Sequence, residues 1–197
     1  MEKDFSSFID GYINLLKDTL SKLDTEEINK ALNALLKAYK NEKTVYIFGN
    51  GGSAATASHF QNDFNKGISE YTQKKFRFCC LNDNIATVLA IANDISFDEI
   101  FRFQLDGRIE EGDLVIAISG SGNSENVLRA VRYAKEKGNT VIGLTGFLGG
   151  ELKKLSDINL HAPVNSMQVT EDIHMVFDHL MMAAFYKTLA NKDHLRK

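Results

Sequence analysis

Two histidines and two acidic residues are the side chains whose types and spacing could support acid–base or metal chemistry. His59 and Asp63 are four residues apart, which would place both on one face of a helix. Glu171 and His179 are eight residues apart on a later helical stretch, about 80° apart around its axis. If the two helices meet, these four side chains could bind zinc tetrahedrally. Spacing alone leaves this open, because a helical His–Asp pair is more often a surface or capping interaction.

Two loops rich in glycine and serine could bind a phosphate. Gly49–Ala54 (GNGGSA) and Ser119–Ser124 (SGSGNS) each follow an apolar run and precede a helical stretch. Glycines let backbone amides approach an anion, and a helix amino terminus adds donors and partial positive charge. Either loop alone could be an ordinary turn, since small polar residues are common turn formers. Two such units together favour a neutral pocket for a phosphate monoester.

The same loops also allow a nucleotide-binding alternative. Neither loop contains the GxxxxGK[ST] motif of P-loop hydrolases, but Gly49, Gly51 and Ala54 fit the looser dinucleotide fingerprint. That fingerprint requires an acidic residue about 20 residues later, at the end of the second strand. The nearest candidate, Asp83, lies 29 residues beyond Ala54. A nucleotide-dependent oxidoreductase therefore fits the sequence less well than a phosphate-binding protein.

The elements that position these residues can be read from the hydrophobic pattern. Five short apolar runs predict strands at Thr44–Gly49, Phe76–Leu81, Leu114–Ser119, Thr140–Thr145 and Ile158–Ala162. Helical stretches lie at Ser53–Phe64, Asp94–Leu105, Ser124–Lys137 and Val169–Leu189. Nearly continuous apolar strands that alternate with helices indicate a parallel sheet covered on both faces. We therefore predict a three-layer α/β sandwich with a five-stranded parallel sheet, whose ligand lies beyond the carboxyl ends of the strands.

The amino-terminal segment predicts two antiparallel helices. Apolar residues recur at helical spacing from Phe5 to Tyr39, with a break at Ser21–Thr25, where Thr25 could cap the second helix. This hairpin could cover the sheet or pair with another subunit. We expect one domain over residues 1–197, with the helical hairpin at 1–40 and the α/β core at 41–190.

Composition excludes several functional classes. The net charge is −3, with 23 basic and 26 acidic residues, so no basic excess is available to bind nucleic acid. No apolar run is long enough for a membrane span, and the first residues do not form a signal peptide, so we expect a soluble cytoplasmic protein. Cys79 and Cys80 are neighbours on a predicted strand and point to opposite faces, which indicates core packing rather than a disulfide.

Four motifs together resemble the sugar isomerase (SIS) domain family, and more narrowly its phosphoheptose isomerase branch. They are GNGGSA at Gly49–Ala54, AND at Ala92–Asp94, ISGSGNS at Ile118–Ser124 and LTGxxGG at Leu144–Gly150. The resemblance covers nearly the whole chain. It implies a flavodoxin-like SIS fold and the interconversion of sedoheptulose 7-phosphate and D-glycero-D-manno-heptose 7-phosphate. The substrate-binding residues implied are Asn50, Gly51, Gly52, Ser53, Asn93, Asp94, Ser119, Gly120, Ser121 and Ser124.

The resemblance also implies one zinc ion per subunit, bound by His59, Asp63, Glu171 and His179. Asp63 stands where the family has Glu, and Glu171 stands where it has Gln. Lys66 and Gly67 occupy the place of a frequent Gly-Arg pair, so an arginine contact to the substrate is either missing or supplied by Lys66. We interpret the changes at 63 and 171 as compensatory, with Glu171 taking part of the base or ligand role.

The implied reaction is an aldose–ketose isomerisation through an enediol. We assign the proton transfers to Asp63 or Glu171 together with His179 as the catalytic groups. His174 is expected to pack in the core or contact another subunit. The resemblance further implies a homotetramer with sites between subunits.

Two other functions stay open. The chain could be a non-catalytic phosphosugar-binding protein, either a regulator or a factor associated with a replication initiator. It could also isomerise a different sugar phosphate, because a phosphate-binding loop says little about carbon count.

Overall fold

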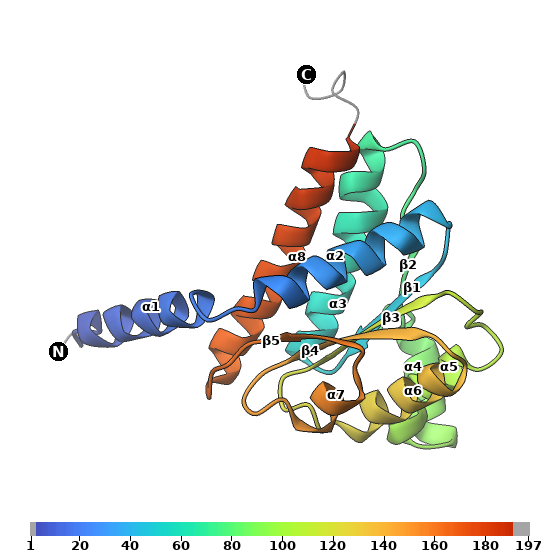
Figure 1. The fold of residues 1–197 in the computed structure, drawn as a ribbon. Helices are drawn as coiled ribbons and strands as arrows, with labels where there is room; N and C mark the ends of the chain where they lie inside the picture. Colours follow the sequence, from blue (N-terminus) through green and yellow to red (C-terminus); the bar gives the residue numbers. More distant parts are fainter. Residues whose placement is uncertain (1–2, 191–197) are drawn as a thin grey trace.

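The computed structural model describes residues 3–190, which form an α/β sandwich around one parallel sheet (Figure 1). The sheet has the strand order β2-β1-β3-β4-β5, which is the flavodoxin-like order. Its strands are β1 (Val45–Gly49), β2 (Phe78–Cys80), β3 (Leu114–Ser119), β4 (Thr140–Thr145) and β5 (Ile158–His161). Every neighbouring pair is parallel. The predicted fold class and the five strand positions are therefore confirmed.

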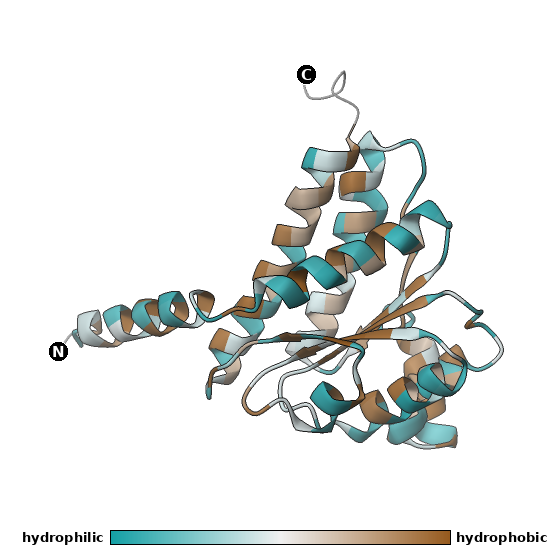
Figure 2. Ribbon diagram, in the orientation of Figure 1, coloured by the Kyte–Doolittle hydropathy of each residue, from teal (hydrophilic) through white to brown (hydrophobic). Residues whose placement is uncertain are grey.

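Helices cover both faces of this sheet. Figure 1 shows α2, α3 and α8 on one face and α4, α5, α6 and α7 on the other. The first group spans α2 (Thr25–Lys40), α3 (Gly52–Asn62) and α8 (Met167–Leu189). The second group spans α4 (Ile85–Asp94), α5 (Arg102–Leu105), α6 (Glu125–Glu136) and α7 (Gly150–Leu155). Figure 2 shows that the strands are largely hydrophobic and that the helices around them carry both hydrophobic and hydrophilic residues.

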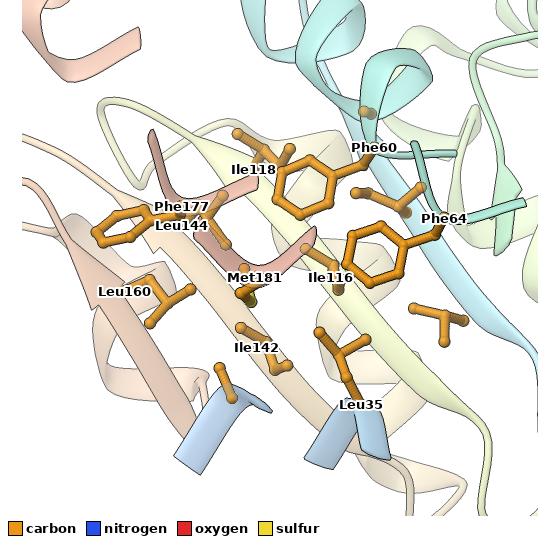
Figure 3. Packing of buried hydrophobic residues seen from close by; sticks show 14 of the residues in the cluster. Leu35, Phe60, Phe64, Ile116, Ile118, Ile142, Leu144, Leu160, Phe177 and Met181 are labelled. Atoms are coloured by element: carbon orange, nitrogen blue, oxygen red, sulfur yellow. The ribbon is translucent and has the colours of Figure 1, made fainter. Parts of the chain in front are cut away.

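The central strands are apolar along their whole length because both of their faces are buried. In β3, Ile116 and Ile118 contribute to the core under α2, α3 and α8, whereas Val115 and Ala117 contribute to the opposite core. Figure 3 shows the first of these cores, where Phe60 of α3 lies close to Ile118. This two-sided burial explains why the strands lack the alternating pattern of half-exposed strands.

Side chains from the helix that follows β1 protect the edge of the sheet at β2. Beyond α3 the chain continues as a π-helix, Asp63–Ile68. The Asn65 amide accepts from the Phe78 N–H at 2.8 Å and donates to the Phe78 carbonyl at 2.8 Å. The Gln61 Oε1 accepts from the Cys80 N–H at 2.6 Å. Because these groups satisfy the outer hydrogen-bonding positions of β2, the edge is closed to pairing with another strand.

The predicted helix at Asp94–Leu105 is wrong. In the structure α4 ends at Asp94 and is followed by a 3-10 turn (Phe97–Glu99) and the short α5. α4 begins before the predicted start because Asn84 caps it: the Asn84 side chain accepts from the Thr87 N–H at 3.1 Å.

The amino-terminal helices form as predicted but do not fold back on each other. Figure 1 shows α1 (Ser6–Leu20) projecting from the body and running on in nearly the same direction as α2. The cap of α2 is Asp24 rather than Thr25, and its carboxylate accepts from the Glu26 and Glu27 N–H groups. The antiparallel pairing expected of this segment is therefore wrong.

The apolar face of α1 is only partly covered within residues 3–190, by the packing of Tyr12 and Leu16 against the core. It is held to the body mainly at its middle, where the Tyr12 hydroxyl donates to the Asp172 carboxylate. Its large apolar side chains are exposed: Phe5, Phe8, Ile9, Ile13, Leu15 and Leu20. Among the described residues, no helix is both long and apolar enough to cross a membrane.

His174 packs in the core of this subunit, which is one of the two alternatives expected from the sequence. Its side chain is 1% exposed, and its Nε2–H donates to the Thr145 carbonyl at 3.2 Å. Burial lowers the pKa of His174 to about 4, because a charged imidazolium would lose its hydration there. An exposed histidine in the unfolded chain has a pKa near 6.5.

This difference predicts that His174 makes the fold less stable in acid. Between pH 6.5 and 4 the unfolded chain takes up a proton at this position and the folded chain does not. We expect the free energy of unfolding to fall by about 2 kcal/mol between pH 7 and pH 5 on this account. Urea unfolding at both pH values measures it, with His174→Gln as a variant that keeps an N–H donor. Equal pH dependence in wild type and variant would contradict the prediction.

Candidate active site

The two glycine–serine loops meet at the carboxyl ends of β1 and β3. They form a cavity of about 310 Å³, which we call the cup. Its lining residues are Asn50, Gly51, Gly52, Ser53, Ile118, Ser119, Gly120, Ser121, Ser124, Met167 and Glu171. Eight of the ten residues expected to bind substrate therefore line one cavity. Asn93 and Asp94 do not line it; they end α4, are exposed, and hydrogen bond to each other at 2.8 Å.

Two helices begin at the cup without a side-chain cap. The N-cap of α3 is Gly51 (φ +55°), and the N-cap of α6 is Ser124, whose hydroxyl makes no capping bond. The Ser124 hydroxyl instead accepts from the Ser119 hydroxyl at 3.3 Å. The Ser53 and Ala54 N–H groups donate to the Asn50 and Gly51 carbonyls at 3.0 Å, so they are occupied. The Gly52 amide of α3 and the Glu125 and Asn126 amides of α6 remain to donate to a ligand, and both helix dipoles favour an anion there.

The geometry of the second loop requires glycine at position 122. Gly122 has φ +69°, and a Cβ at this position would lie 1.9 Å from the Gly149 carbonyl oxygen. Its N–H donates to the Ser119 carbonyl at 2.9 Å. The loop therefore packs directly on the backbone of the chain segment after β4, which fixes the positions of its hydroxyl groups.

Asparagine side chains hold the first loop in place. Two of them, Asn82 and Asn126, were not predicted from the sequence. The Asn50 and Asn126 side chains exchange two hydrogen bonds of 2.9 Å, which tie the loop to the first turn of α6. Asn82 donates to the Gly49 carbonyl at 2.9 Å and accepts from the Gly49 N–H at 3.2 Å. A signal for Asn126 was available, since it lies two residues after the serine loop.

A second group of polar side chains lies where α3 continues into the π-helix. His59, Asp63, Asp178 and His179 each offer a ligand atom, and these atoms lie within 4.8 Å of one another. We call them the His/Asp group. The Nε2 atoms of His59 and His179 are 3.2 Å apart. The Asp63 Oδ2 is 3.5 Å from the His59 Nε2 and 3.9 Å from the His179 Nε2.

The structure brings together three of the four expected metal ligands and replaces the fourth. Asp178 joins His59, Asp63 and His179, whereas Glu171 does not belong to the group. The Glu171 carboxylate lies in the cup, where a Cβ on Gly52 would come within 2.0 Å of its Oε1. The expectation that Glu171 completes the metal set is not met by this arrangement.

The two carboxylates of the His/Asp group are buried, whereas both histidines are half exposed. Asp178 is 0% exposed, and neither of its carboxylate oxygens has a partner among the described residues. Burial, and to a lesser extent the nearby Asp63 carboxylate, raise the pKa of Asp178 to about 8. A cation between the two carboxylates would offset both effects.

The donors fit a divalent metal ion. Zinc binds imidazole nitrogens at about 2.0–2.1 Å, so two tetrahedral nitrogen ligands lie about 3.3 Å apart. The separation of 3.2 Å between the two Nε2 atoms matches this spacing. Two neutral imidazole nitrogens at that distance would otherwise repel unless one carries a proton. The His/Asp group is therefore a possible metal-binding site by geometry and by donor type.

Lys66 does not reach the cup. Its ammonium group pairs with the Glu70 carboxylate at 2.6 Å on the surface. The expected replacement of an arginine contact by Lys66 is therefore absent from this arrangement of the described residues.

Comparison with known proteins shows the family of this chain. The SIS domain family model matches residues 7–146, which include both loops of the cup. The chain belongs to the SIS domain family. Within this family it belongs to the phosphoheptose isomerase branch, since it is 36% identical to the phosphoheptose isomerase of Aliarcobacter butzleri over 154 residues. That match covers 78% of this chain and 81% of the relative.

Solved structures of the same branch have the same fold as this SIS domain protein. The phosphoheptose isomerase from Neisseria gonorrhoeae is 28% identical and superimposes with a TM-score of 0.84, covering 93% of this chain and 97% of that chain. The phosphoheptose isomerase from Francisella tularensis is 27% identical, with a TM-score of 0.85 and coverages of 93% and 96%. The predicted family resemblance is confirmed.

The packing of Gly122 predicts a large difference between two glycine substitutions. Gly122→Ala and Gly138→Ala both place a side chain at positive φ, but a Cβ on Gly138 has nothing within 4 Å. We expect Gly122→Ala to lower the free energy of unfolding by about 2–3 kcal/mol more, because only this variant forces backbones apart. Urea unfolding of both variants measures the difference. Equal losses would show that the loop relaxes without strain.

Proposed function

We propose that this chain interconverts sedoheptulose 7-phosphate and D-glycero-D-manno-heptose 7-phosphate. The observation that carries the proposal is the position of the cup and the His/Asp group along one helix. The cup contains the amino terminus of α3, and His59 and Asp63 lie at its other end. A substrate with its phosphate in the cup would extend along α3 toward the His/Asp group.

The length of α3 between the two sites suits a seven-carbon chain. Ser53 in the cup and His59 are six residues apart, which corresponds to a rise of about 9 Å. An extended chain advances about 1.2 Å per bond, so the seven bonds from C2 to phosphorus in a heptose 7-phosphate span about 8 Å. The five bonds of a pentose 5-phosphate span about 6 Å. The longer sugar therefore fits better.

The phosphate would be bound by neutral donors. Hydroxyl groups of Ser53, Ser119, Ser121 and Ser124 line the cup, and the Gly52, Glu125 and Asn126 amides begin the two helices there. These groups would bind the phosphate through neutral donors. The rest of the sugar could then extend toward the His/Asp group.

Asp63 and His179 are assigned the two proton transfers between C1 and C2. The Asp63 carboxylate removes the proton next to the carbonyl, and His179 delivers a proton to the neighbouring carbon. His59, Asp63 and His179 would also hold zinc, one ion per subunit, which when bound supplies positive charge that stabilises an enediolate. A carboxylate has two oxygens and an imidazole two nitrogens, so Asp63 and His179 would each bind the ion through one atom and exchange a proton through the other. Glu171 lies beside the phosphate end, far from C1 and C2, so we assign it hydrogen bonds from sugar hydroxyl groups rather than the role of base.

Activity on sedoheptulose 7-phosphate tests this proposal. We expect conversion that is lost on treatment with a chelator and restored by zinc. Asp63→Asn keeps the size of the side chain but removes the base, so kcat should fall by about 10²–10⁴-fold. A chromatographic assay of both heptose phosphates measures this.

Binding of sedoheptulose 7-phosphate without conversion would favour the alternative, a non-catalytic phosphosugar-binding protein. Faster conversion of a pentose or hexose phosphate would contradict the assignment of a seven-carbon substrate. The expected cytoplasmic location stays a prediction.

We further propose that the protein is a homotetramer. Two separate apolar surfaces are exposed among the described residues: one on α1, and one formed by Ile85, Leu89, Ile95, Phe97 and Phe103 around α4. Uncovered apolar surfaces of this kind mark interfaces. Because two different self-complementary interfaces generate a tetramer with dihedral symmetry, the two surfaces suit that assembly. A neighbouring subunit could then also bring its side chains to the cup.

Light scattering tests the role of α1. Four chains of 22.0 kDa give a mass of 88 kDa (4 × 22.0). Phe8→Asp places a charge on the exposed apolar face and should reduce the mass at micromolar concentration, whereas Asp10→Asn on the same helix should not. An unchanged mass for Phe8→Asp would contradict an interface at α1.

A further inference from the structure

We propose that Asp178 is a ligand of the divalent metal ion at the His/Asp group, in the place that the family resemblance gives to Glu171. This inference rests on the metal site of the proposed function, but it does not depend on the identity of the sugar. It assigns a role to a residue that spacing alone did not reveal.

The burial of Asp178 is the first argument. Its side chain is completely buried, and both carboxylate oxygens lack a hydrogen-bond partner among residues 3–190. A buried carboxyl group without partners is strongly unfavourable, and natural proteins retain such groups when they are paired or coordinate a metal. The position of Asp178 is therefore explained by a ligand that is a cation.

The direction of Asp178 is the second argument. It offers an oxygen within 4.8 Å of the ligand atoms of His59, Asp63 and His179. Two helices supply these donors in equal number: His59 lies on α3 and Asp63 directly follows it, while Asp178 and His179 are neighbours on α8. The cation would thus bind between the two helices, with one imidazole and one carboxylate from each side.

The place of Glu171 is the third argument. It precedes Asp178 by seven residues on α8, which is two helical turns or about 10.5 Å. Its carboxylate lies against Gly52 in the cup. A set with Asp178 keeps Glu171 free for the substrate, and it holds two negative carboxylates and two neutral imidazoles against a doubly charged ion.

Metal affinity tests the inference without any substrate. Zinc is titrated against a chromophoric chelator in wild type, Asp178→Asn and Glu171→Gln. Loss of a direct ligand should weaken binding by more than the roughly 100-fold limit typical of outer-shell partners. Glu171→Gln should bind zinc within about threefold of wild type, because its carboxylate is not a ligand.

A cysteine placed at each position gives a direct spectroscopic readout with cobalt as the probe. Asp178→Cys should show an absorption band from charge transfer between thiolate and Co²⁺, since a thiolate in the shell coordinates the ion. Glu171→Cys is the matched control and should show none. This comparison remains decisive if Asp178→Asn folds poorly, because a thiol is a small neutral side chain that suits a buried position.

The outcomes separate this inference from the proposed function. Wild-type zinc affinity in Asp178→Asn, or a thiolate band in Glu171→Cys and none in Asp178→Cys, would overturn the inference. Weakened zinc binding in Asp178→Asn with a thiolate band in Asp178→Cys would support it, even in a protein that converts no heptose phosphate. That last result would remove the proposed reaction and leave the metal site standing.

Discussion

The close approach of α3 to α8 is the constraint on which the whole site depends. Two glycines face α8, Gly52 at the start of α3 and Gly67 in the π-helix that follows it. A Cβ on Gly52 would lie 2.0 Å from the Glu171 carboxylate, and a Cβ on Gly67 would lie 2.7 Å from the Met182 methyl group. The spacing of packed helices is set by the side chains at their contact. At both positions the nearest atom is the flexible end of a side chain, so a larger residue would displace the Glu171 carboxylate or the Met182 methyl group before it moved α8.

The cup and the His/Asp group differ in their electrostatics. The cup offers hydroxyl groups and helix amides, so it attracts a phosphate through dipoles. The His/Asp group concentrates formal charge, with two buried carboxylates, Asp63 and Asp178, beside two imidazoles. Glu171 is the exception, because it brings a negative charge into the cup. A doubly charged phosphate would be repelled by that carboxylate unless the sugar hydroxyl groups lie between them, which orients the substrate with its chain along α3.

The sequence predicts the parts of this structure that depend on local pattern. The buried strands, both loops and the convergence of His59, Asp63 and His179 follow from periodicity, spacing and family motifs. Tertiary packing decides the rest. Asp178 was missed because an acidic residue next to His179 normally faces solvent, and its burial arises from a wide contact face of α8 that also buries Thr170 and His174. Their spacing of four residues, Thr170–His174–Asp178, was the signal for a polar row inside the core. The prediction of an antiparallel α1–α2 hairpin was wrong because amphipathicity reveals an apolar face but not which surface covers it.

Metal binding, helix packing and substrate orientation are coupled through α8. Without a cation, the chain carries an unpaired acid at the contact between α3 and α8, and this opposes the packing of the two helices. A cation that binds the folded chain alone adds about 2.7 kcal/mol of stability at a concentration 100 times its dissociation constant. That stabilisation acts at the helix contact itself. Because α8 also carries Glu171 against Gly52 in the cup, an ion bound at the proposed metal site would stabilise the helix contact that places Glu171 there.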